Sequence, residues 1–370
     1  MATWLIGLKR IELKIVFLVK RVYTGKDLIE DCFGRLFHFP SLLTKMGHEC
    51  VVYALDFKST SALSTRKDNV QFHTIPVKAF WRLPLMRRLY RDLMMTNADV
   101  VFSSGDSYLG YLGLKIARRL SAKAVFDIYD DYSFFSSNKL PFMHALLKSA
   151  ASNSDLLVCA SEPLRQKYGA FLENTLLIQN GVDTNVFRPE EKDIARKKVN
   201  LRSDDIVVGY LGSIHKPRGA ADLIAAIEQL RANGQDIKLL MAGLDLGEVN
   251  LDHPWIDYRG MVDQNDLVPM INSCNVVTIP YRDTELIRMT NACKLMEYIA
   301  CRVPIVVSDV SDYASYFPAS FNCVAKPSDP ASLGAAIANQ LKNKNVADID
   351  QVLTWKNLAA RLDGSIRKLI

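Results

Sequence analysis

The fold is decided by the stretch IVVGYLGSIHKPRG at residues 206–219, which a helical pattern follows over residues 220–230. Its first six residues are mostly apolar and predict a buried strand, and the glycines after them predict a tight loop that opens a helix. Such a loop lets backbone N–H groups approach an anion, and Lys216 or Arg218 adds positive charge. An ordinary strand–helix turn is the alternative, because neither the GxGxxG nor the P-loop spacing is present.

Short β-branched runs and longer helical patterns alternate along the whole chain. In the first half, strands are expected at residues 14–19, 50–54, 100–102, 124–128 and 156–159, and helices at 35–46, 85–95, 110–120 and 141–150. In the second half, the expected strands are 206–211, 238–242, 276–280, 305–307 and 322–325. This alternation is typical of parallel sheets with helices on both faces. We therefore predict two doubly wound, Rossmann-like α/β domains that face a cleft, with ligands at the carboxyl ends of their strands.

The boundary between the two domains is predicted near residues 180–189. Asn180 and Gly181 supply a turn, and Pro189 ends regular structure before the charged run at residues 190–198. The 370 residues suffice for roughly two domains of about 150 residues each. We therefore place an N-terminal domain at residues 1–188 and a C-terminal domain at residues 189–352.

Composition and charge exclude several classes of protein. The seven scattered cysteines form no CxxC pair, which argues against a disulfide framework or a zinc site and favours the cytoplasm. No apolar run approaches the ~20 residues of a transmembrane helix. Residues 1–188 carry 25 Lys and Arg against 17 Asp and Glu, whereas residues 189–370 carry 21 against 23. This mild basic excess suggests an anionic surface or acceptor for the first half, and no nucleic-acid-binding motif accompanies it.

The sequence NACKLMEYIA at residues 291–300 is a second candidate site. Asn291 is expected to be the N-cap of a helix, and Lys294 and Glu297 then share one helical face with Cys301. A carboxylate there could accept hydrogen bonds from two ribose hydroxyls, while the helix N-terminal amides face a diphosphate. The alternative is a solvent-facing Lys–Glu pair, which stabilises a helix by about 0.2–0.5 kcal/mol.

Polar residues of the first half form two further candidates. The sequence DIYDDY at residues 127–132 follows a predicted strand, and Asp130 could orient a sugar hydroxyl or act as a base. A polar loop whose aspartate caps the next helix is the alternative. Arg35 could face the cleft, although an exposed arginine at the start of a helix is commoner.

The segment from Phe80 to Met95 is a candidate membrane contact. It contains four arginines, interleaved with large apolar side chains: Arg82, Arg87, Arg88 and Arg91. A basic amphipathic helix of this kind can lie on an anionic bilayer, which predicts peripheral attachment to the inner face of the cell membrane. A core-facing helix with a solvated basic face is the alternative.

Taken in order, these pieces resemble the family-4 retaining glycosyltransferases of the GT-B fold, over nearly the whole chain. The motifs that carry the resemblance are MGHE at 46–49, CASE at 159–162, NGVD at 180–183 with FRP at 187–189, Gly212 with Arg218 and Gly219, and KLMEYIA at 294–300 with VPIV at 303–306.

The resemblance implies a donor site for a nucleoside-diphosphate sugar, of UDP or GDP type, in the C-terminal domain. It implies that Glu297 holds the ribose, that Arg218 binds the diphosphate and that Gly260 lies near the base, while Gly212, Ser213, Asn291 and Lys294 complete the site. It also implies no metal cofactor, and the sole DxD, at residues 348–350, lies far from these motifs. A last helix, at residues 353–370, is expected to cross back onto the N-terminal domain.

The same resemblance implies transfer, with retention of configuration, to a hydroxyl of a glycan or lipid-linked acceptor, as in cell-envelope polysaccharide or glycoconjugate synthesis. Asp130 and Tyr129, which stands where the family often has histidine, are the candidate catalytic residues of the first domain, and Arg218 is that of the second. The leaving phosphate would itself accept the proton of the acceptor.

The chain also departs from the family pattern. Met289 replaces the first glutamate of the Glu-x7-Glu motif, for which Glu285 is the available substitute, and Arg302 replaces a common glycine. Two alternative functions therefore stay open: a nucleotide-sugar epimerase of the same fold, and a catalytically inactive sugar-nucleotide-binding protein.

Overall fold

The computed structural model describes residues 12–370 except 24, 78–82 and 349–351. Contacts divide the described residues into two compact units. The first contains the chain up to Ala160, Leu164–Ile178 and Trp355–Ile370, and the second contains Ser161–Pro163 and Gln179–Thr354. The units therefore divide after Ile178, whereas the sequence pattern placed the boundary after residue 188.

The first unit is built on a sheet with the order β10-β9-β8-β7-β1-β4-β6-β5. Its strands are β1 (Lys14–Lys20), β4 (Glu49–Asp56), β5 (Ser64–Lys67), β6 (Val70–Pro76), β7 (Val100–Ser104), β8 (Lys123–Ile128), β9 (Leu156–Cys159) and β10 (Thr175–Leu177). All pair in parallel except β5, which is antiparallel to β6. A separate antiparallel pair, β2 (Val22–Tyr23) and β3 (Lys26–Asp27), follows β1.

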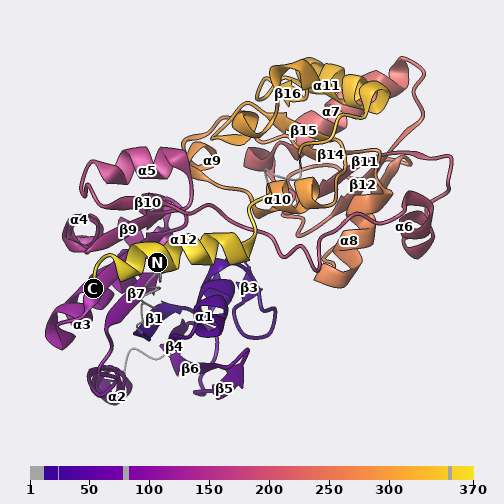
Figure 1. Cartoon of the computed structure of the whole chain (residues 1–370). Helices are drawn as coiled ribbons and strands as arrows, with labels where there is room; N and C mark the ends of the chain where they lie inside the picture. Colours follow the sequence, from indigo (N-terminus) through magenta and orange to yellow (C-terminus); the bar gives the residue numbers. More distant parts are fainter. Residues whose placement is uncertain (1–11, 24, 78–82, 349–351) are drawn as a thin grey trace, which may run out of the picture. The chain divides into compact units, whose positions relative to one another are not determined.

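Helices cover both faces of this sheet (Figure 1). They are α1 (Arg35–Lys45), α2 (Leu83–Met94), α3 (Ser107–Leu120), α4 (Met143–Asn153), α5 (Glu162–Gly169, of which Leu164 onward belongs to this unit) and α12 (Trp355–Arg367). Val16 and Leu18 of β1 pack in one core cluster with residues of α2 and α3. The ring of Trp355 on α12 stacks on His38 of α1, with ring centroids 5.1 Å apart. The last helix thus packs within the first unit.

The second unit is built on a fully parallel sheet with the order β13-β12-β11-β14-β15-β16. Its strands are β11 (Ile206–Leu211), β12 (Ile237–Ala242), β13 (Ile256–Tyr258), β14 (Val276–Ile279), β15 (Ile305–Ser308) and β16 (Val324–Ala325). Its longer helices are α6 (Lys192–Lys198), α7 (Ala220–Ala232), α8 (Gln264–Ser273), α10 (Cys293–Ala300) and α11 (Pro330–Asn343), and α9 (Glu285–Met289) is a single short turn.

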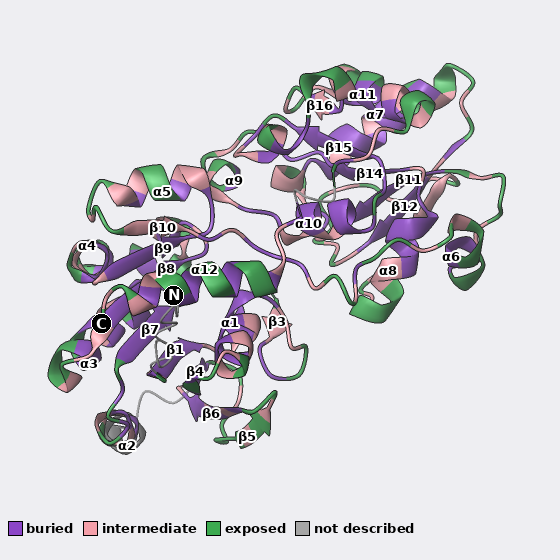
Figure 2. Ribbon diagram, viewed as in Figure 1, coloured by how far each residue is buried: buried purple, intermediate pink, exposed green. Residues whose placement is uncertain are grey.

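Side chains of β11 alternate between two buried cores, one on each face of the sheet. Val207 and Leu211 pack with residues of α8 and α10, whereas Val208 and Tyr210 pack with residues of α7 and α11. Figure 1 shows α7 and α11 on one side of this sheet and α8 and α10 on the other, and Figure 2 shows its strands as buried. The prediction of two doubly wound parallel α/β domains is therefore confirmed.

Candidate functional site

The second sheet reverses its strand order between β11 and β14, which are neighbours although β12 and β13 lie between them in sequence. Ligands of doubly wound sheets bind outside the carboxyl ends of the strands at such a point. β11 leads there into Gly212 and the stretch up to Gly219, and β14 leads into Pro280 and Tyr281. The glycine stretch that decides the fold thus lies where this architecture places its ligands.

Two glycines allow the loops at this point to approach closely. At Gly219, whose φ is +71°, an added Cβ would lie 1.6 Å from the carbonyl oxygen of Pro280, so the loop after β11 can touch the end of β14 only with glycine there. At Gly212, an added Cβ would lie 1.9 Å from Nζ of Lys294. Glycine at this position therefore makes room for the Lys294 amine beside the loop.

Helix α10 brings Lys294 and Glu297 to this loop. The Tyr298 hydroxyl lies 3.3 Å from the backbone nitrogen of Leu211, which donates to it, and so ties α10 to the last residue of β11. Lys294 and Glu297 are three residues apart and both half-buried, and the charge of Glu297 acts on the pKa of Lys294. Lys294 therefore lies against the glycine loop rather than in open solvent, and Glu297 is half-buried on the same helix.

Arg218 and Lys294 converge on Tyr281. The Arg218 guanidinium carbon lies 4.4 Å from the ring centroid of Tyr281, and Nζ of Lys294 lies 5.5 Å from that centroid and 4.9 Å from that of Tyr210. Tyr281 is itself buried, with 2% of its surface exposed, and its ring packs edge-on against Tyr313 at 6.0 Å. Arg218 and Lys294 thus lie beside the same group of aromatic rings.

The electrostatics of this cluster favour a bound anion. Burial raises the pKa of a tyrosine, but the charges of Arg218 and Lys294 outweigh it at Tyr281, so its pKa lies below the ordinary 10.0. Burial and Arg218 lower the pKa of Lys294, although Tyr281 and Glu297 act in the opposite direction. Burial and Arg218 also lower the pKa of His215 in the same loop. Positive potential is therefore concentrated where β11 and β14 end.

The loops after three neighbouring strands join at the same edge. The backbone nitrogen of Gly212 donates to Ala242 at the end of β12, and that of Gly243 donates to the carbonyl of Gly260 after β13, both at 2.7 Å. The Tyr210 hydroxyl donates to the carbonyl of Ser213 at 2.6 Å. Gly260, with φ +66°, borders open space, because no heavy atom lies within 4 Å of a Cβ placed on it. These hydrogen bonds hold the loops together beside the cation cluster and leave open space at Gly260.

The expectation that Asn291 caps α10 is wrong. The helix begins after Ala292 and has no side-chain cap. The Asn291 side chain instead accepts a hydrogen bond from the backbone nitrogen of Asn180, and its carbonyl accepts one from the Asn180 side chain, both at 2.8 Å. The two asparagines thus join the segment before α10 to the residues that follow Ile178. No local sequence pattern predicts this contact.

The first unit places Tyr129 and Asp130 after β8, as predicted, but in different surroundings. Tyr129 is buried between the rings of Tyr23 and Tyr132, each 5.4 Å away, and burial together with Asp130 raises its pKa well above the ordinary value. Its phenol therefore stays protonated and can donate a hydrogen bond. Asp130 is half-buried and accepts a hydrogen bond from the backbone of Asp131 at 2.9 Å.

The sequence offered two possibilities for Arg35, a side chain that faces the cleft or an exposed one at a helix start. The structure instead shows a buried side chain. It is 1% exposed, and its guanidinium donates to Asp127 at 2.8 Å and to the carbonyl of Ile178 at 2.9 Å. Burial raises the pKa of Asp127, while Arg35 and Ser104 act against that change. Arg35 thus forms a buried structural ion pair.

Tyr281 is the functional candidate that the sequence analysis missed. The predicted strand at 276–280 ended one residue before it, so the rule that ligands gather after strand ends already pointed to this position. Its proximity to Arg218 and Lys294 depends on residues more than 60 and 10 positions away, respectively, and only the structure reveals it.

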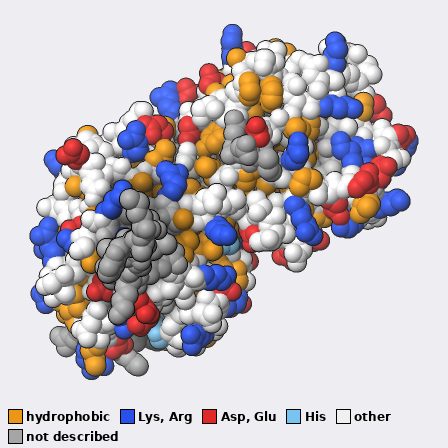
Figure 3. Space-filling view, in the orientation of Figure 1, with side chains coloured by type: hydrophobic (Ala, Val, Ile, Leu, Met, Phe, Trp, Pro, Cys, Tyr) orange, Lys and Arg blue, Asp and Glu red, His pale blue; other side chains and the backbone are white. Residues whose placement is uncertain are grey.

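Part of the predicted membrane contact, residues 80–82, lies outside the described residues, as do the side chains of residues 83–88. In the rest of α2, Leu89 and Leu93 are buried and Arg91 is exposed. Figure 3 shows basic and acidic side chains interspersed over the visible face. Within the described chain, no helix combines the length and apolar character needed to cross a membrane.

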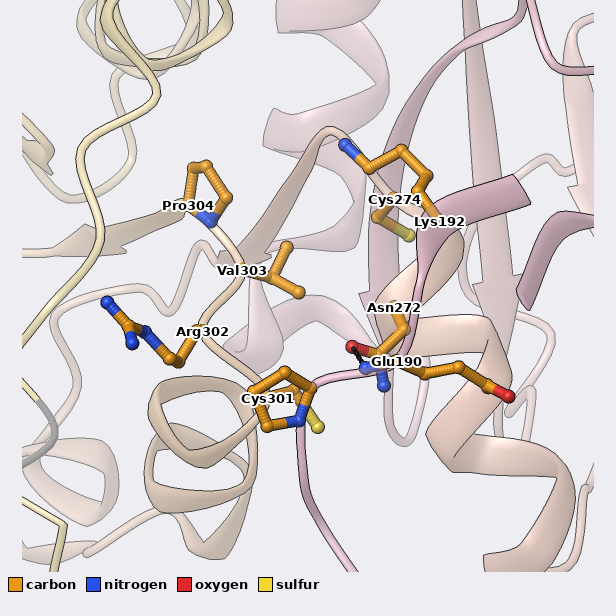
Figure 4. Close-up of a pocket in the computed structure, with 9 residues that line it drawn as sticks. Glu190, Lys192, Asn272, Cys274, Cys301, Arg302, Val303 and Pro304 are labelled. Atoms are coloured by element: carbon orange, nitrogen blue, oxygen red, sulfur yellow. Dashed lines mark hydrogen bonds between the residues drawn. The ribbon is translucent and has the colours of Figure 1, made fainter. Parts of the chain in front are cut away.

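A separate cavity of about 340 Å³ lies in the second unit, beside the residues that lead into β14 and β15 (Figure 4). Cys274, Cys301 and Arg302 are among the residues that line it, and burial raises the pKa of both thiols to about 12. Because it adjoins the amino ends of these strands, it is distinct from the cation cluster at their carboxyl ends.

In the described ranges, no group of three or more His, Cys, Asp or Glu is arranged to hold a metal ion.

Comparison with known families agrees with this arrangement. Residues 205–343 match the family model of Glycosyl transferases group 1, and residues 41–186 match that of Glycosyltransferase Family 4. The structure of sucrose-phosphate synthase from Thermosynechococcus elongatus is similar, with a TM-score of 0.75 and 16% identity over 97% of this chain and 99% of that one. The chain therefore carries the two domains of the GT-B fold, one matched by each family model.

Individual relatives of this chain are distant. It is 26% identical, over 45% of its length, to a D-inositol 3-phosphate glycosyltransferase of Stackebrandtia nassauensis. It is 24% identical, over 34% of its length, to the capsular polysaccharide biosynthesis glycosyltransferase CapM of Staphylococcus aureus. These matches span 39% and 32% of the two curated relatives. HepE of Anabaena in complex with UDP-glucose has a TM-score of 0.66 and 16% identity, over 97% of each chain.

Proposed function

We propose that this protein transfers a glycosyl group from a nucleoside-diphosphate sugar to an acceptor hydroxyl. The observation that carries the proposal is the convergence of Arg218 and Lys294 on Tyr281 at the reversal of the second sheet. Two cations held in one partly buried place suit a diphosphate, which carries negative charge on both phosphates. The complexes of HepE with UDP and UDP-glucose favour UDP as the nucleotide.

Each part of the donor then has a candidate partner. The diphosphate lies against Arg218 and Lys294 and accepts a hydrogen bond from the backbone amide of Ser213. Gly212, whose amide donates to Ala242, contributes by leaving room for Lys294. The ribose hydroxyls donate to Glu297. The base lies beside Gly260, where the structure leaves open space. Asn291 acts indirectly, by holding the segment before α10 through Asn180.

The chemistry follows from where charge develops. When the bond between the sugar and the diphosphate breaks, the electron pair passes to a phosphate oxygen, and Arg218 and Lys294 stabilise the added charge. The acceptor hydroxyl attacks from the same face, its proton passes to the leaving phosphate, and the configuration of the sugar is retained. In the first unit, Asp130 orients the acceptor hydroxyl, and Tyr129 donates a hydrogen bond, because its raised pKa prevents it from acting as a base.

The acceptor and location are further parts of the proposal. The name of CapM supports a glycan acceptor of the cell envelope, and the name of the inositol-phosphate relative supports a small hydroxylated one. We place the protein in the cytoplasm, with peripheral attachment to an anionic membrane through residues 80–95. Vesicle sedimentation with the Arg82/Arg87/Arg88/Arg91→Glu variant tests this attachment, which requires wild-type binding that salt weakens and that the variant lacks.

A panel of UDP, GDP and ADP in a thermal-shift assay tests the donor site. A nucleotide at about 100 times its Kd stabilises the folded protein by about 2.7 kcal/mol. UDP is expected to raise Tm in the wild type and in Lys342→Met, an exposed-lysine control, but not in Arg218→Met. No shift with any nucleotide in the wild type would refute the donor site.

Incubation with the donor distinguishes the remaining alternatives. Epimerised sugar formed from donor alone identifies an isomerase of the same fold. Tight donor binding without turnover across many acceptors identifies an inactive binding protein, which Met289 and Arg302 suggested. Glycosyl transfer to an acceptor, with retention seen by NMR of the product, supports the proposal.

A further inference from the structure

Tyr281 lies where a neutral apolar side chain would be expected to complete a buried core. Its neighbours come from four elements: Arg218 from the loop after β11, Lys294 from α10, Tyr313 from the 3-10 turn Tyr313–Tyr316, and Tyr210 from β11. The hydroxyls of Tyr313 and Tyr210 donate to carbonyls, those of Thr290 and Ser213. Tyr281, in contrast, interacts through its side chain with the two cations.

Lys294 is not neutralised by a carboxylate among the described residues of this cluster. Lys294 makes no ion pair with a carboxylate in the described part of the chain, although the charge of Glu297 acts on it. Asp222, the nearby buried carboxylate, is taken by a bidentate pair with Arg282, at 2.7 Å to each oxygen. His215, which also feels Arg218 and Lys294, adds no negative charge. The phenol oxygen of Tyr281 is thus an ionisable group with which both cations interact.

We propose that Tyr281 is a proton-linked counter-charge: above the pH at which its phenol ionises, its oxygen stabilises Arg218 and Lys294, and it takes up a proton when these cations turn to a bound diphosphate. This inference rests on the proposed function and adds a positioning residue to that site. The physical reason is that a diphosphate brings negative charge beside the phenol, which favours its neutral form. Once neutral, Tyr281 no longer competes with the nucleotide for the two cations.

The sign of the pH dependence follows. Because its pKa lies below the ordinary 10.0, Tyr281 becomes a phenolate at a lower pH than an exposed tyrosine does. Above that pH, binding of a diphosphate requires uptake of one proton, so the apparent affinity falls by up to about tenfold per pH unit. Below it, the affinity does not depend on this group. Lys294, whose pKa is also lowered, loses its charge in the same direction, so affinity alone does not isolate Tyr281.

The phenolate itself provides the specific measurement. We would titrate the full-length protein from neutral to alkaline pH and record the ultraviolet absorbance of phenolate, with and without UDP, while calorimetry on the same samples measures UDP binding. The variants are Tyr281→Phe and the control Tyr316→Phe, which removes a buried hydroxyl that accepts a hydrogen bond from Gln179 at 3.0 Å. The expected result is one early-titrating phenolate that UDP abolishes, present in the wild type and the control and absent from Tyr281→Phe.

Three results would overturn the inference. If UDP binds the wild type but leaves the absorbance unchanged, Tyr281 is not linked to binding, although the donor site stands. If Tyr281→Phe keeps the same early phenolate, the signal belongs to another tyrosine. If calorimetry shows no UDP binding at any pH, the proposed function fails, and the inference fails with it. If Tyr281→Phe does not fold, a wild type without an early phenolate, or with one that UDP leaves unchanged, still overturns the inference.

Discussion

The carboxyl edges of the two sheets treat positive charge in opposite ways. In the first unit, cations lie against carboxylates: Lys20 on Asp106 at 2.9 Å, Arg35 on Asp127 at 2.8 Å and Lys167 on Asp131 at 2.6 Å. In the second unit, Arg218 and Lys294 lie against the rings of Tyr281 and Tyr210. The carboxylates of the first edge neutralise its cations, which suits an uncharged, hydroxyl-rich ligand. At the second edge the two cations lie on aromatic rings, an arrangement that suits an anion.

This contrast has an energetic basis. A buried ion pair recovers its desolvation cost only while both partners are present, so it fixes structure but offers little to a ligand. A cation over an aromatic ring gains only about 0.5–2 kcal/mol, which a diphosphate can replace with stronger charge-assisted hydrogen bonds. The same residue type, arginine, therefore lies on a buried carboxylate at position 35 and over an aromatic ring at position 218.

Loss of a partner in the first edge should have the largest effect on stability. Asp127→Asn leaves the Arg35 guanidinium buried without a compensating charge, and removing one partner of a buried pair costs about 3–5 kcal/mol. We expect this decrease in the free energy of unfolding of the first unit. Chemical denaturation measures it, with calorimetry to separate the transitions of the two units.

The control for this prediction is Asp68→Asn, which breaks the exposed Lys45–Asp68 pair at 3.2 Å. Exposed pairs contribute about 0–1 kcal/mol, and asparagine tolerates the φ of +48° at this position. Equal losses in Asp127→Asn and Asp68→Asn would show that the Arg35–Asp127 pair is not the structural contact described above.

The next effect concerns the ribose. Glu297→Ala removes a charged acceptor for two hydroxyls, and each such hydrogen bond contributes about 1.5–3 kcal/mol. UDP affinity should therefore fall at least about tenfold, while affinity for inorganic diphosphate, which has no ribose, stays unchanged. Calorimetry with both ligands measures this, and Glu228→Ala, at an exposed position, is the control. If binding of UDP and of inorganic diphosphate weakens equally, Glu297 acts on the phosphates and not on the ribose.

Removal of a cation from the second edge should affect binding and spare stability. Lys294→Met deletes one charged contact to the diphosphate, at about 1.5–3 kcal/mol, so UDP and inorganic diphosphate both weaken by at least about tenfold. The free energy of unfolding of the second unit stays the same or rises, because a desolvated ammonium beside Arg218 is no longer buried. A loss of stability comparable with that of Asp127→Asn would mean that the two edges do not differ as described.

The framework of these edges could be predicted from the sequence because its signals are local. The strand expected at residues 206–211 is observed with the same ends, since the five residues after Ile206 are buried and their side chains pack in cores on both faces of the sheet. The strand expected at 322–325 contains only Val324 and Ala325, because Asn322 adopts a left-handed conformation with φ +47° after a 3-10 turn. The pattern of apolar residues predicts that such strands exist but does not predict where they end.

The contacts that give the two edges their character could not be predicted, because they join distant residues. Arg35 and Asp127 are 92 positions apart, and Asn180 and Asn291 are 111 apart. Arg35 and Asn291 also have ordinary local roles, as a helix-start arginine and a helix cap, and the sequence pattern indicated those roles. Tyr281 had no local signal beyond its place after a strand.

The smallest effect should come from the amino edge of the second sheet, where Arg302 lines the cavity of Figure 4. Arg302 follows the end of α10 in a left-handed conformation, with φ +55°. Its backbone nitrogen donates to the carbonyl of Ile299 at 2.9 Å, and that of Val303 donates to the carbonyl of Tyr298 at 3.4 Å. These are the two hydrogen bonds of a Schellman motif. Glycine suits this position, and Figure 4 shows the Arg302 side chain directed away from Glu190. Arg302→Gly should raise the free energy of unfolding by about 0.5–1 kcal/mol and leave UDP affinity unchanged. Arg302→Ala, which keeps a Cβ, should give no such gain, and equal stability of the two variants would show that backbone strain is not the cause.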